Sequence, residues 1–254
     1  MNQESNGGIE RVEIIGVPIS ATNMDECVDF LISNFEATRG EYVCVSNVHT
    51  TVMAHDDPCY KTVQSSSILS LPDGKPLSVL GSKVFPKMGR VTGPDLMREL
   101  FENERASAFS HYFYGNTKES LDVLIRELER SYPSLRIAGY EPSVFRPLTE
   151  TEENELCSRI DASHADFVWV GLGAPRQENL CFKLKGRTNS CMVGVGGAFN
   201  ILAGITPEAP RWMQNLSLEW LYRLIQEPKR LFKRYFVTNT KFILYVMASK
   251  TRKA

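Results

Sequence analysis

Short apolar runs alternate with stretches of helical periodicity along most of this chain. The compact runs that read as strands lie at residues 42–45, 68–71, 112–114, 135–138, 167–170 and 192–195. Helical patterns separate several of them, at residues 49–63, 117–130, 150–160 and 176–185. Strands that alternate with helices form parallel sheets covered on both faces. The sequence therefore predicts an α/β fold with a largely parallel sheet flanked by helices.

Two more elements are expected before the first of these strands. Residues 11–19 alternate around Gly16, which is typical of a short opening strand or hairpin. Residues 24–35 read as an amphipathic helix that Thr22 or Asn23 would cap. Asp56-Asp57 falls inside the helical pattern at 49–63, which favours a solvated helix face over a metal-binding acidic pair.

The end of the chain carries a different charge from the rest. Residues 210–254 hold ten Lys or Arg and two acids, a net charge of +8, whereas the whole chain carries −1. The composition changes near residues 207–210, so we expect an α/β domain over residues 1–209 and a basic, aromatic helical appendage over residues 210–254. Basic amphipathic helices of this kind suit anionic lipid headgroups or pyrophosphates. The alternative is a docked helix whose charges are merely solvated.

Other classes of protein find little support. No apolar run approaches the ~20 residues that a membrane-spanning helix needs, and the polar beginning does not resemble a signal peptide. Six cysteines lie far apart, which favours reduced thiols in a cytoplasmic protein. The four histidines show no zinc spacing, and no nucleophile elbow or nucleic-acid motif occurs. We therefore expect neither a metal, nor covalent catalysis, nor a nucleic-acid partner.

Two polar loops follow predicted strands, where ligands bind in open α/β sheets. Ser46, Asn47 and Thr50 stand where a helix begins, which suits either a bound phosphate or sugar or ordinary capping by Asn47. Asp73, in Pro72-Asp73-Gly74, could point into a cleft as a general base. Plain turn chemistry is the alternative, and the residues alone favour it.

Two glycine-rich loops follow the last two strands. Gly171-Leu172-Gly173 lets the backbone approach a ligand, and Pro175 fits the first position of a helix. Arg176 stands where a third glycine would complete the dinucleotide fingerprint of a Rossmann fold, so NAD binding is disfavoured while nucleotide binding stays open. The loop at residues 194–200 permits either close approach to a ligand or tight packing of helix on strand.

Taken together, seven segments in a fixed order resemble the WecG/TagA/CpsF glycosyltransferases (glycosyltransferase family 26). The resemblance covers about residues 10–245. The segments are Ser46-Asn47, Pro72-Asp73-Gly74, Arg90-Val91-Thr92-Gly93-Pro94-Asp95-Leu96, Tyr114-Gly115, Gly171-x-Gly173-x-Pro175-x-Gln177-Glu178, Gly194-Val195-Gly196, and Arg211-Trp212 with Glu219-Trp220 and Glu227-Pro228-x-Arg230.

The resemblance implies a Rossmann-like enzyme that transfers a sugar from a UDP-sugar to a polyprenyl-diphosphate-linked saccharide, with inversion. Such enzymes work in bacterial cell-surface polysaccharide biosynthesis, such as that of teichoic acid and exopolysaccharide, without a metal ion or cofactor. They imply a peripheral position on the inner face of the cytoplasmic membrane. The sugar stays open among N-acetylmannosamine, its uronic acid, glucose and galactose, with N-acetylmannosamine favoured by family association. The acceptor and the oligomeric state, a homo-oligomer included, also stay open.

Carried onto this chain, the resemblance makes Asp73 the base that deprotonates the acceptor hydroxyl. Arg90 would balance phosphate charge, and Asn47 and Gln177 would help to hold the nucleotide sugar. Four basic residues would face the lipid diphosphate or the leaving UDP, namely Arg223, Arg230, Lys233 and Arg234. The remaining substrate-binding positions that it implies are Ser46, Thr50, Gly93, Gly115, Gly173, Glu178 and Gly196.

One departure and two alternatives remain. The family often has Thr two positions before the Asn of its first loop, and this chain has Val45 there, which questions any sugar contact by that hydroxyl. A non-catalytic nucleotide-binding regulatory module is the main alternative. A Rossmann-type oxidoreductase is the other, and the broken glycine fingerprint disfavours it.

Overall fold

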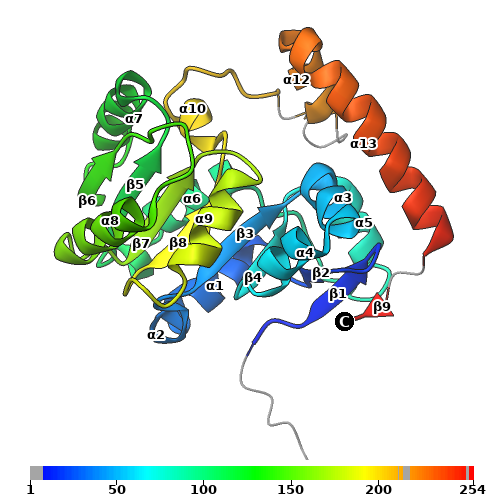
Figure 1. Cartoon of the computed structure of the whole chain (residues 1–254), viewed down its shortest axis with the longest axis horizontal. Coiled ribbons are helices and arrows are strands. Elements are labelled where there is room, and N and C mark those ends of the chain that lie inside the picture. The colour runs from blue at the N-terminus through cyan, green and yellow to red at the C-terminus, as the bar shows by residue number, and fades with distance from the viewer. Residues whose placement is uncertain (1–7, 211, 214–217, 250–251) are drawn as a thin grey trace, which may run out of the picture.

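A six-stranded parallel sheet forms the centre of the protein, in the strand order β4-β3-β8-β7-β5-β6 (Figure 1). The computed structural model describes residues 8–210, 212–213, 218–249 and 252–254, apart from the side chains of Arg230 and Arg234. The strands are β3 (Tyr42–Ser46), β4 (Leu69–Pro72), β5 (Ser110–Gly115), β6 (Arg136–Glu141), β7 (Phe167–Gly171) and β8 (Cys191–Gly194). The parallel sheet predicted from the sequence is confirmed.

Helices cover both faces of this sheet, as the alternation predicted. One face packs against α1 (Met24–Ser33), α6 (Gly93–Glu102), α7 (Lys118–Ser131) and α10 (Ala198–Leu202). The other packs against α8 (Glu150–Ala162) and α9 (Arg176–Leu184). Because both faces are covered, every residue of β7 is buried, and its sequence is an almost continuous apolar run.

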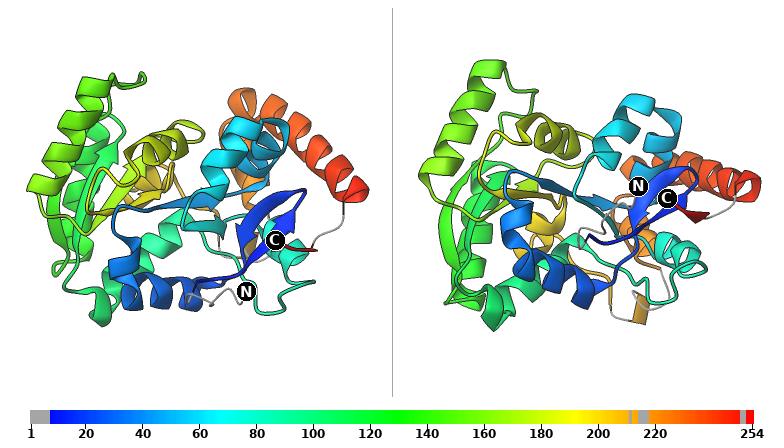
Figure 2. Two further views of the ribbon diagram at one scale, coloured as in Figure 1. Left: turned by 60° about the horizontal axis from the view of Figure 1, so that its bottom comes forward. Right: turned by 90° about the horizontal axis from the view of Figure 1, so that it is seen from below.

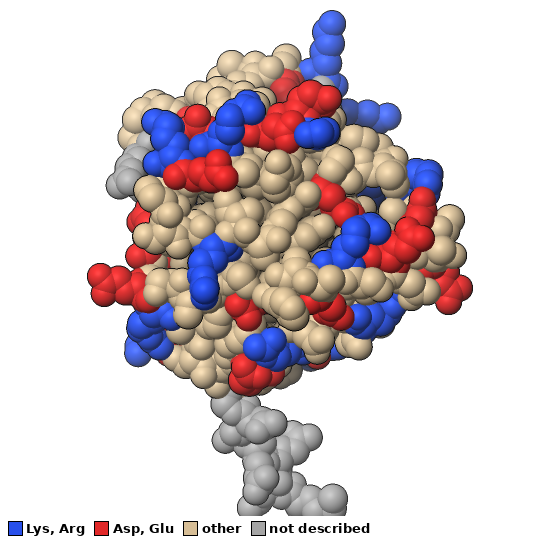
Figure 3. Space-filling view, turned by 90° about the vertical axis from the view of Figure 1, so that its left-hand side faces the viewer, with Lys and Arg blue, Asp and Glu red and all other residues tan. Residues whose placement is uncertain are grey.

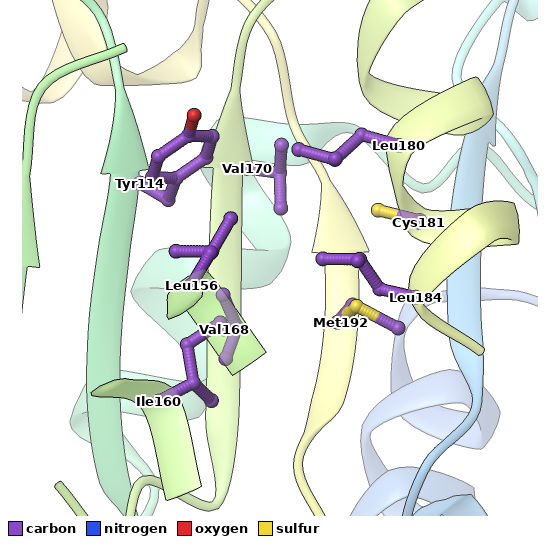
Figure 4. Close-up of a pocket in the computed structure, with 9 residues that line it drawn as sticks. All are labelled: Tyr114, Leu156, Ile160, Val168, Val170, Leu180, Cys181, Leu184 and Met192. Carbon is purple, nitrogen blue, oxygen red and sulfur yellow. The ribbon is translucent and has the colours of Figure 1, made fainter. Parts of the chain in front are cut away.

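A small apolar cavity of about 10 Å³ lies between the sheet and helices α8 and α9. In Figure 4 its lining side chains, among them Leu156, Val170 and Leu180, point toward one another from both helices and from the strands. A space of this size holds about one water molecule, and an apolar lining offers that water few partners. This cavity is therefore a packing gap in the core and not a ligand site.

An antiparallel hairpin precedes the sheet, as one of the two expected forms for residues 11–19. Strands β1 (Arg11–Ile14) and β2 (Val17–Ser20) pair with Ile14 opposite Val17. The two turn residues, Ile15 and Gly16, both have positive φ, 47° and 75°, which a two-residue hairpin turn that follows the strand twist requires. The hairpin buries its apolar side chains in a separate core together with α3 (Val48–Asp56), α4 (Pro58–Ser65) and α5 (Lys75–Gly81).

The single helix expected at residues 49–63 is wrong, because the chain breaks between α3 and α4. Asp57 ends the first helix, and its side chain accepts a hydrogen bond from the N–H of Cys59 to cap the second. Pro58 follows directly, and its ring lacks an N–H and clashes with a continuing helix. The helix expected at residues 24–35 ends at Ser33 and is followed by the short α2 (Phe35–Thr38), while Asn23 caps α1 as expected.

The described C-terminal residues include the helices α12 (Glu219–Gln226) and α13 (Pro228–Ala248), which are separated at Glu227. Helix α13 lies along α3 and the hairpin in Figures 1 and 2, and Phe242 is buried there. Lys241 Nζ lies 2.6 Å from Oδ2 of Asp56, and Tyr245 donates to Oδ1 of the same carboxylate. Asp56 is exposed, as expected for a solvated helix face, and its carboxylate also contacts α13.

Past α13, the short strand β9 (Arg252–Lys253) pairs antiparallel with β1. No helix in the described ranges combines the length and the apolar character that crossing a bilayer demands. On the face shown in Figure 3, Lys and Arg are interspersed with Asp and Glu. That face has no patch of a single sign.

Candidate active site

The loops expected to carry the chemistry meet at one edge of the sheet, because all six parallel strands end there. Strand β7 continues into α9 on one face, and the α3–α4 pair that follows β3 contacts α9 through α4. Strands β5 and β8 continue into α7 and α10 on the opposite face. Neighbouring connections thus separate at the carboxyl ends of the strands, which is where open α/β sheets bind their ligands.

Asp73 follows β4 directly and is held by the neighbouring strand, since its N–H donates to the carbonyl of Ser46 over 2.8 Å. The next residue, Gly74, packs against the start of α3, where an added Cβ would lie 3.8 Å from the nitrogen of Val48. Burial raises the pKa of Asp73 to about 6, against the opposing effect of two nearby arginines. A carboxyl group with this pKa is ionised at neutral pH and can accept a proton there.

Arg90 connects this loop to the C-terminal segment. Its Nε donates to the backbone carbonyl of Asp73 over 3.1 Å, and its Nη2 donates to Oε2 of Glu219 over 2.5 Å. The N–H of Val91 donates to the carbonyl of Pro72, which fixes the backbone of Arg90 beside β4. The guanidinium therefore lies next to Asp73, between the parallel sheet and α12.

Helix α12 brings two further charges to Asp73. Glu219 and Arg223 are four residues apart, so they lie on the same side of the helix. Arg223 lowers the pKa of Asp73, as Arg90 does, whereas Glu219 and Asp95 raise it. The basic segment thus contributes to the surroundings of the candidate base. Lys233 is exposed on α13, and the side chains of Arg230 and Arg234, to which the resemblance also assigns a role, lie outside the described part of the structure.

The first loop uses its polar groups to start α3. Oδ1 of Asn47 accepts hydrogen bonds from the N–H groups of His49 and Thr50, and Oγ1 of Thr50 accepts one from the N–H of Asn47. The capping interpretation of Asn47 is thereby confirmed. Ser46 is fully buried, with its hydroxyl 2.8 Å from that of Ser70, and Val45 is buried in the core. At the carboxyl edge of the sheet this loop presents the N-terminus of α3, which favours anions.

Gln177 joins the loops that follow β7 and β8. The N–H of Gly173 donates to Oε1 of Gln177 over 2.9 Å, and a Cβ added to Gly194 would lie 3.1 Å from Cγ of Gln177. Gly173 and Gly196 have positive φ, 76° and 54°, which favours glycine at both positions. Glu178 lies behind Gln177 and is only 1% exposed, so its side chain is not open to a ligand at this edge of the sheet.

Two other predicted glycines serve close packing of the loops. A Cβ on Gly115 would lie 2.7 Å from the carbonyl group of Gly171, and φ of Gly115 is 135°. A Cβ on Gly93, at the start of α6, would lie 3.2 Å from the carbonyl oxygen of Val195. Pro175 is the N-cap residue of α9 and not its first helical residue, one position from the prediction.

Several residues of this edge were not among the predicted site residues. Glu219 and Asp95 both act on Asp73, and Asn116 donates to Asn200 over 2.8 Å across the loops after β5 and β8. Phe145 is 58% exposed and has a positive φ, and its backbone carbonyl accepts a hydrogen bond from Arg176. The four-residue spacing of Glu219 from Arg223 was a visible signal for the first of these. Within the described ranges no three His, Cys, Asp or Glu side chains gather as a metal site would require.

The structure has a Rossmann-like parallel sheet, and Asp73, the candidate base, lies near Arg90 and Arg223 at the carboxyl edge of that sheet. The chain belongs to the WecG/TagA/CpsF family of glycosyltransferases, since the sequence profile "Glycosyl transferase WecG/TagA/CpsF family" matches residues 12–254. The protein is accordingly a transferase. This sets aside the regulatory module and the oxidoreductase as alternatives.

Two curated relatives from Bacillus are similar over most of their length. A protein of Bacillus spizizenii is 29% identical over 232 residues, which cover 88% of this chain and 87% of the relative. A protein of Bacillus subtilis strain 168 is 28% identical over 243 residues, which cover 94% of this chain and 92% of the relative. Both are named N-acetylglucosaminyldiphosphoundecaprenol N-acetyl-β-D-mannosaminyltransferase.

Proposed function

We propose that this glycosyltransferase moves N-acetylmannosamine from UDP-N-acetylmannosamine to N-acetylglucosamine linked through a diphosphate to a polyprenol. The names of the two Bacillus relatives support the acceptor and the sugar. Family membership supports the glycosyl transfer itself. The observation that carries the proposal is Asp73, a carboxyl group with a pKa of about 6 that stands beside Arg90 and Arg223.

The reaction is a direct displacement with inversion. Asp73 takes the proton of the acceptor hydroxyl while that oxygen attacks the anomeric carbon of the donor sugar. The bond from the anomeric carbon to the diphosphate breaks as the new bond forms, and its electron pair leaves with UDP. Asp73 suits the role of base because it is ionised at neutral pH, and its raised pKa strengthens it as a proton acceptor.

The negative charge of the leaving UDP requires stabilisation. We assign this stabilisation to cationic side chains and the N-terminus of a helix, without a metal ion. Arg90 and Arg223 are described cations that lower the pKa of Asp73. Arg230, Lys233 and Arg234 extend this set as part of the proposal. The dipole of α3, whose first N–H groups are capped by Asn47, would favour the diphosphate, and the backbone of the glycine loops beside Gln177 would border the sugar.

We also propose that α13 lies on the inner face of the cytoplasmic membrane. Phe232, Phe236, Ile243 and Met247 are 63%, 67%, 58% and 80% exposed. At 100° per residue they fall within one stripe of the helix surface, away from the buried Phe242. Lys229 and Lys233 border this stripe and are exposed. An apolar stripe bordered by lysines matches the boundary between acyl chains and anionic headgroups.

A product assay tests the proposal. The protein is incubated with a panel of UDP-sugars and a short-chain prenyl-diphosphate N-acetylglucosamine, and the products are identified by mass. We expect a gain of one N-acetylhexosamine from UDP-N-acetylmannosamine. Asp73→Asn should abolish that product, whereas Asp57→Asn, which keeps a capping side chain on α4, should not. Transfer of a different sugar would refute the proposed donor, and full activity of Asp73→Asn would refute the proposed base.

A further inference from the structure

The carboxyl group of Glu178 is buried behind the glycine loops that follow β7 and β8. Glu178 is 1% exposed, and its Oε1 accepts a hydrogen bond of 2.9 Å from Nε2 of Gln177. Its other oxygen, Oε2, is buried and makes no hydrogen bond of normal geometry among the described residues, and the hydroxyl of Tyr60 is the polar group that faces the carboxyl. An acidic side chain in this position is costly, because an ionised carboxylate loses its hydration there. Such a group calls for a role that an apolar residue could not perform.

The two ends of the Gln177 amide face different partners. Its Oε1 accepts from the N–H of Gly173, and its Nε2 donates to Glu178. If the amide were turned over, its NH₂ group would face the N–H of Gly173, and its oxygen would face the oxygen of Glu178. Both contacts would then be repulsive when Glu178 is ionised, since a carboxylate only accepts. Glu178 therefore selects the orientation of Gln177 that can hold the loop.

In that orientation the side chain of Gln177 contacts both loops that follow β7 and β8. Gln177 makes a second hydrogen bond with Gly173, because the backbone N–H of Gln177 donates to the carbonyl of Gly173 over 3.2 Å. A Cβ added to Gly196 would lie 3.3 Å from Oε1 of Gln177. The amide thus lies between the backbone of two loops, at the edge where the nucleotide sugar would bind.

We propose that Glu178 is a positioning residue for the sugar donor, which fixes the amide of Gln177 and through it the loop at residues 171–173. It is not itself a substrate contact. This inference rests on the proposed function, because it concerns the binding of the UDP-sugar at the same edge. It also replaces the expectation from the sequence that Glu178 binds the substrate directly.

The surroundings of Glu178 make this role sensitive to pH. The titratable groups that face it are Cys44 of β3, Tyr60 of α4 and Cys181 of α9, and burial raises the pKa of all three, so they stay neutral. Burial also raises the pKa of Glu178 to about 7. Above that pH the ionised form accepts the Gln177 hydrogen bond strongly, and below it the neutral acid accepts it weakly. Donor binding should therefore weaken as the pH falls through 7.

Calorimetric titration with UDP-N-acetylmannosamine tests the inference on the full-length protein. Glu178→Met keeps the volume and removes the acceptor, and it should raise Kd for the donor at least tenfold at pH 8. Glu178→Gln keeps an acceptor oxygen but not the negative charge, so at pH 8 it should raise Kd about threefold to tenfold, as protonation of Glu178 does in the wild type. At saturating donor, kcat should change less than threefold in both variants, because the effect lies in binding. Equal Kd values for Glu178→Met and the wild type would overturn the inference.

A matched control separates positioning from general loss of stability. Glu153, on α8, is another buried acid, 5% exposed, and it pairs with Lys183 near the C-terminal end of α9 and with Arg187 just beyond that helix. Glu153→Gln should lower Tm and leave Kd for the donor unchanged. If Glu153→Gln weakened donor binding as much as Glu178→Met does, the effect would be structural and the inference would fail.

The pH dependence keeps the inference testable even if Glu178→Met does not fold. Between pH 8 and pH 6, Kd for the donor should rise about threefold to tenfold in the wild type and stay level in Glu178→Gln. The intact UDP-sugar suits this test because its diphosphate is a diester that does not titrate in this range. A parallel pH dependence in both proteins would overturn the positioning role. Absence of binding of any UDP-sugar to the wild type would instead overturn the proposed function, and this inference with it.

Discussion

Replacing Asp73 by Asn should make the protein inactive and more stable at the same time. The pKa of Asp73 is raised from an ordinary value of 3.8 to about 6, and burial is the main cause. A rise of this size corresponds to about 3 kcal/mol against the ionised form. Because Asp73 is only partly buried, solvent screening reduces this figure, and we expect about 1.5–3 kcal/mol.

The sign of the effect follows from proton binding. Between pH 3.8 and about 6 the folded protein keeps the proton on Asp73 and the unfolded chain has lost it, so stability falls as the pH rises. This contribution is fully present below pH 3.8 and is lost above about pH 6. Asn mimics the neutral acid at every pH. The variant should therefore exceed the wild type in free energy of unfolding at pH 8, and the difference should shrink to about half at pH 5.

Two measurements on the same variant check this prediction. Urea unfolding at pH 8 and pH 5 gives the difference in stability, and the transfer assay gives kcat, which should fall about 10²–10⁴-fold with the loss of a general base. Unchanged donor affinity would show that the site is intact. A variant that is inactive but less stable than the wild type at pH 8 would refute the reasoning, because the carboxylate would then be stabilising and not strained by burial.

Three further predictions concern the rest of the site and the membrane. Arg223→Gln removes a cation that lowers the pKa of Asp73, so the acidic limb of the pH–kcat profile should move up by about one pH unit; a downward shift would contradict the geometry. Gly115→Ala places a Cβ 2.7 Å from the backbone of β7 at φ 135°, so it should cost more than about 2 kcal/mol of stability, and a variant as stable as the wild type would contradict it. Phe236→Ser should weaken co-sedimentation with anionic vesicles about tenfold, while Phe182→Ser, on α9, should not; equal binding of both variants would remove α13 from the membrane contact.

The sheet could be predicted from the sequence because its signal is local. Each strand shows its own short apolar run, and the helices between them show their own period. Asp57-Pro58 marks the break between α3 and α4 in the sequence, although the helical period of the apolar residues continues across it. Proline overrides such a period because no neighbouring residue can replace its missing N–H.

The site was harder to predict, because its residues come together from distant parts of the chain. Arg90 and Glu219 are 129 residues apart, and neither alone indicates that it will pair with the other. The residues Pro72-Asp73-Gly74 alone favour a plain turn, and only the family resemblance indicates that Asp73 is a base. The burial that raises the pKa of Asp73 depends on the fold and cannot be recognised from three residues. The same holds for Glu178, whose burial depends on α4 packing against α9.

The anomeric configuration of the product tests the central claim most directly. The protein is supplied with α-linked UDP-N-acetylmannosamine and the prenyl-diphosphate N-acetylglucosamine acceptor, and the new linkage is assigned by NMR from its one-bond carbon–proton coupling. Direct displacement assisted by the single base Asp73 predicts a β linkage. An α linkage would contradict the account, because retention needs a second displacement or an attack from the side of the leaving group.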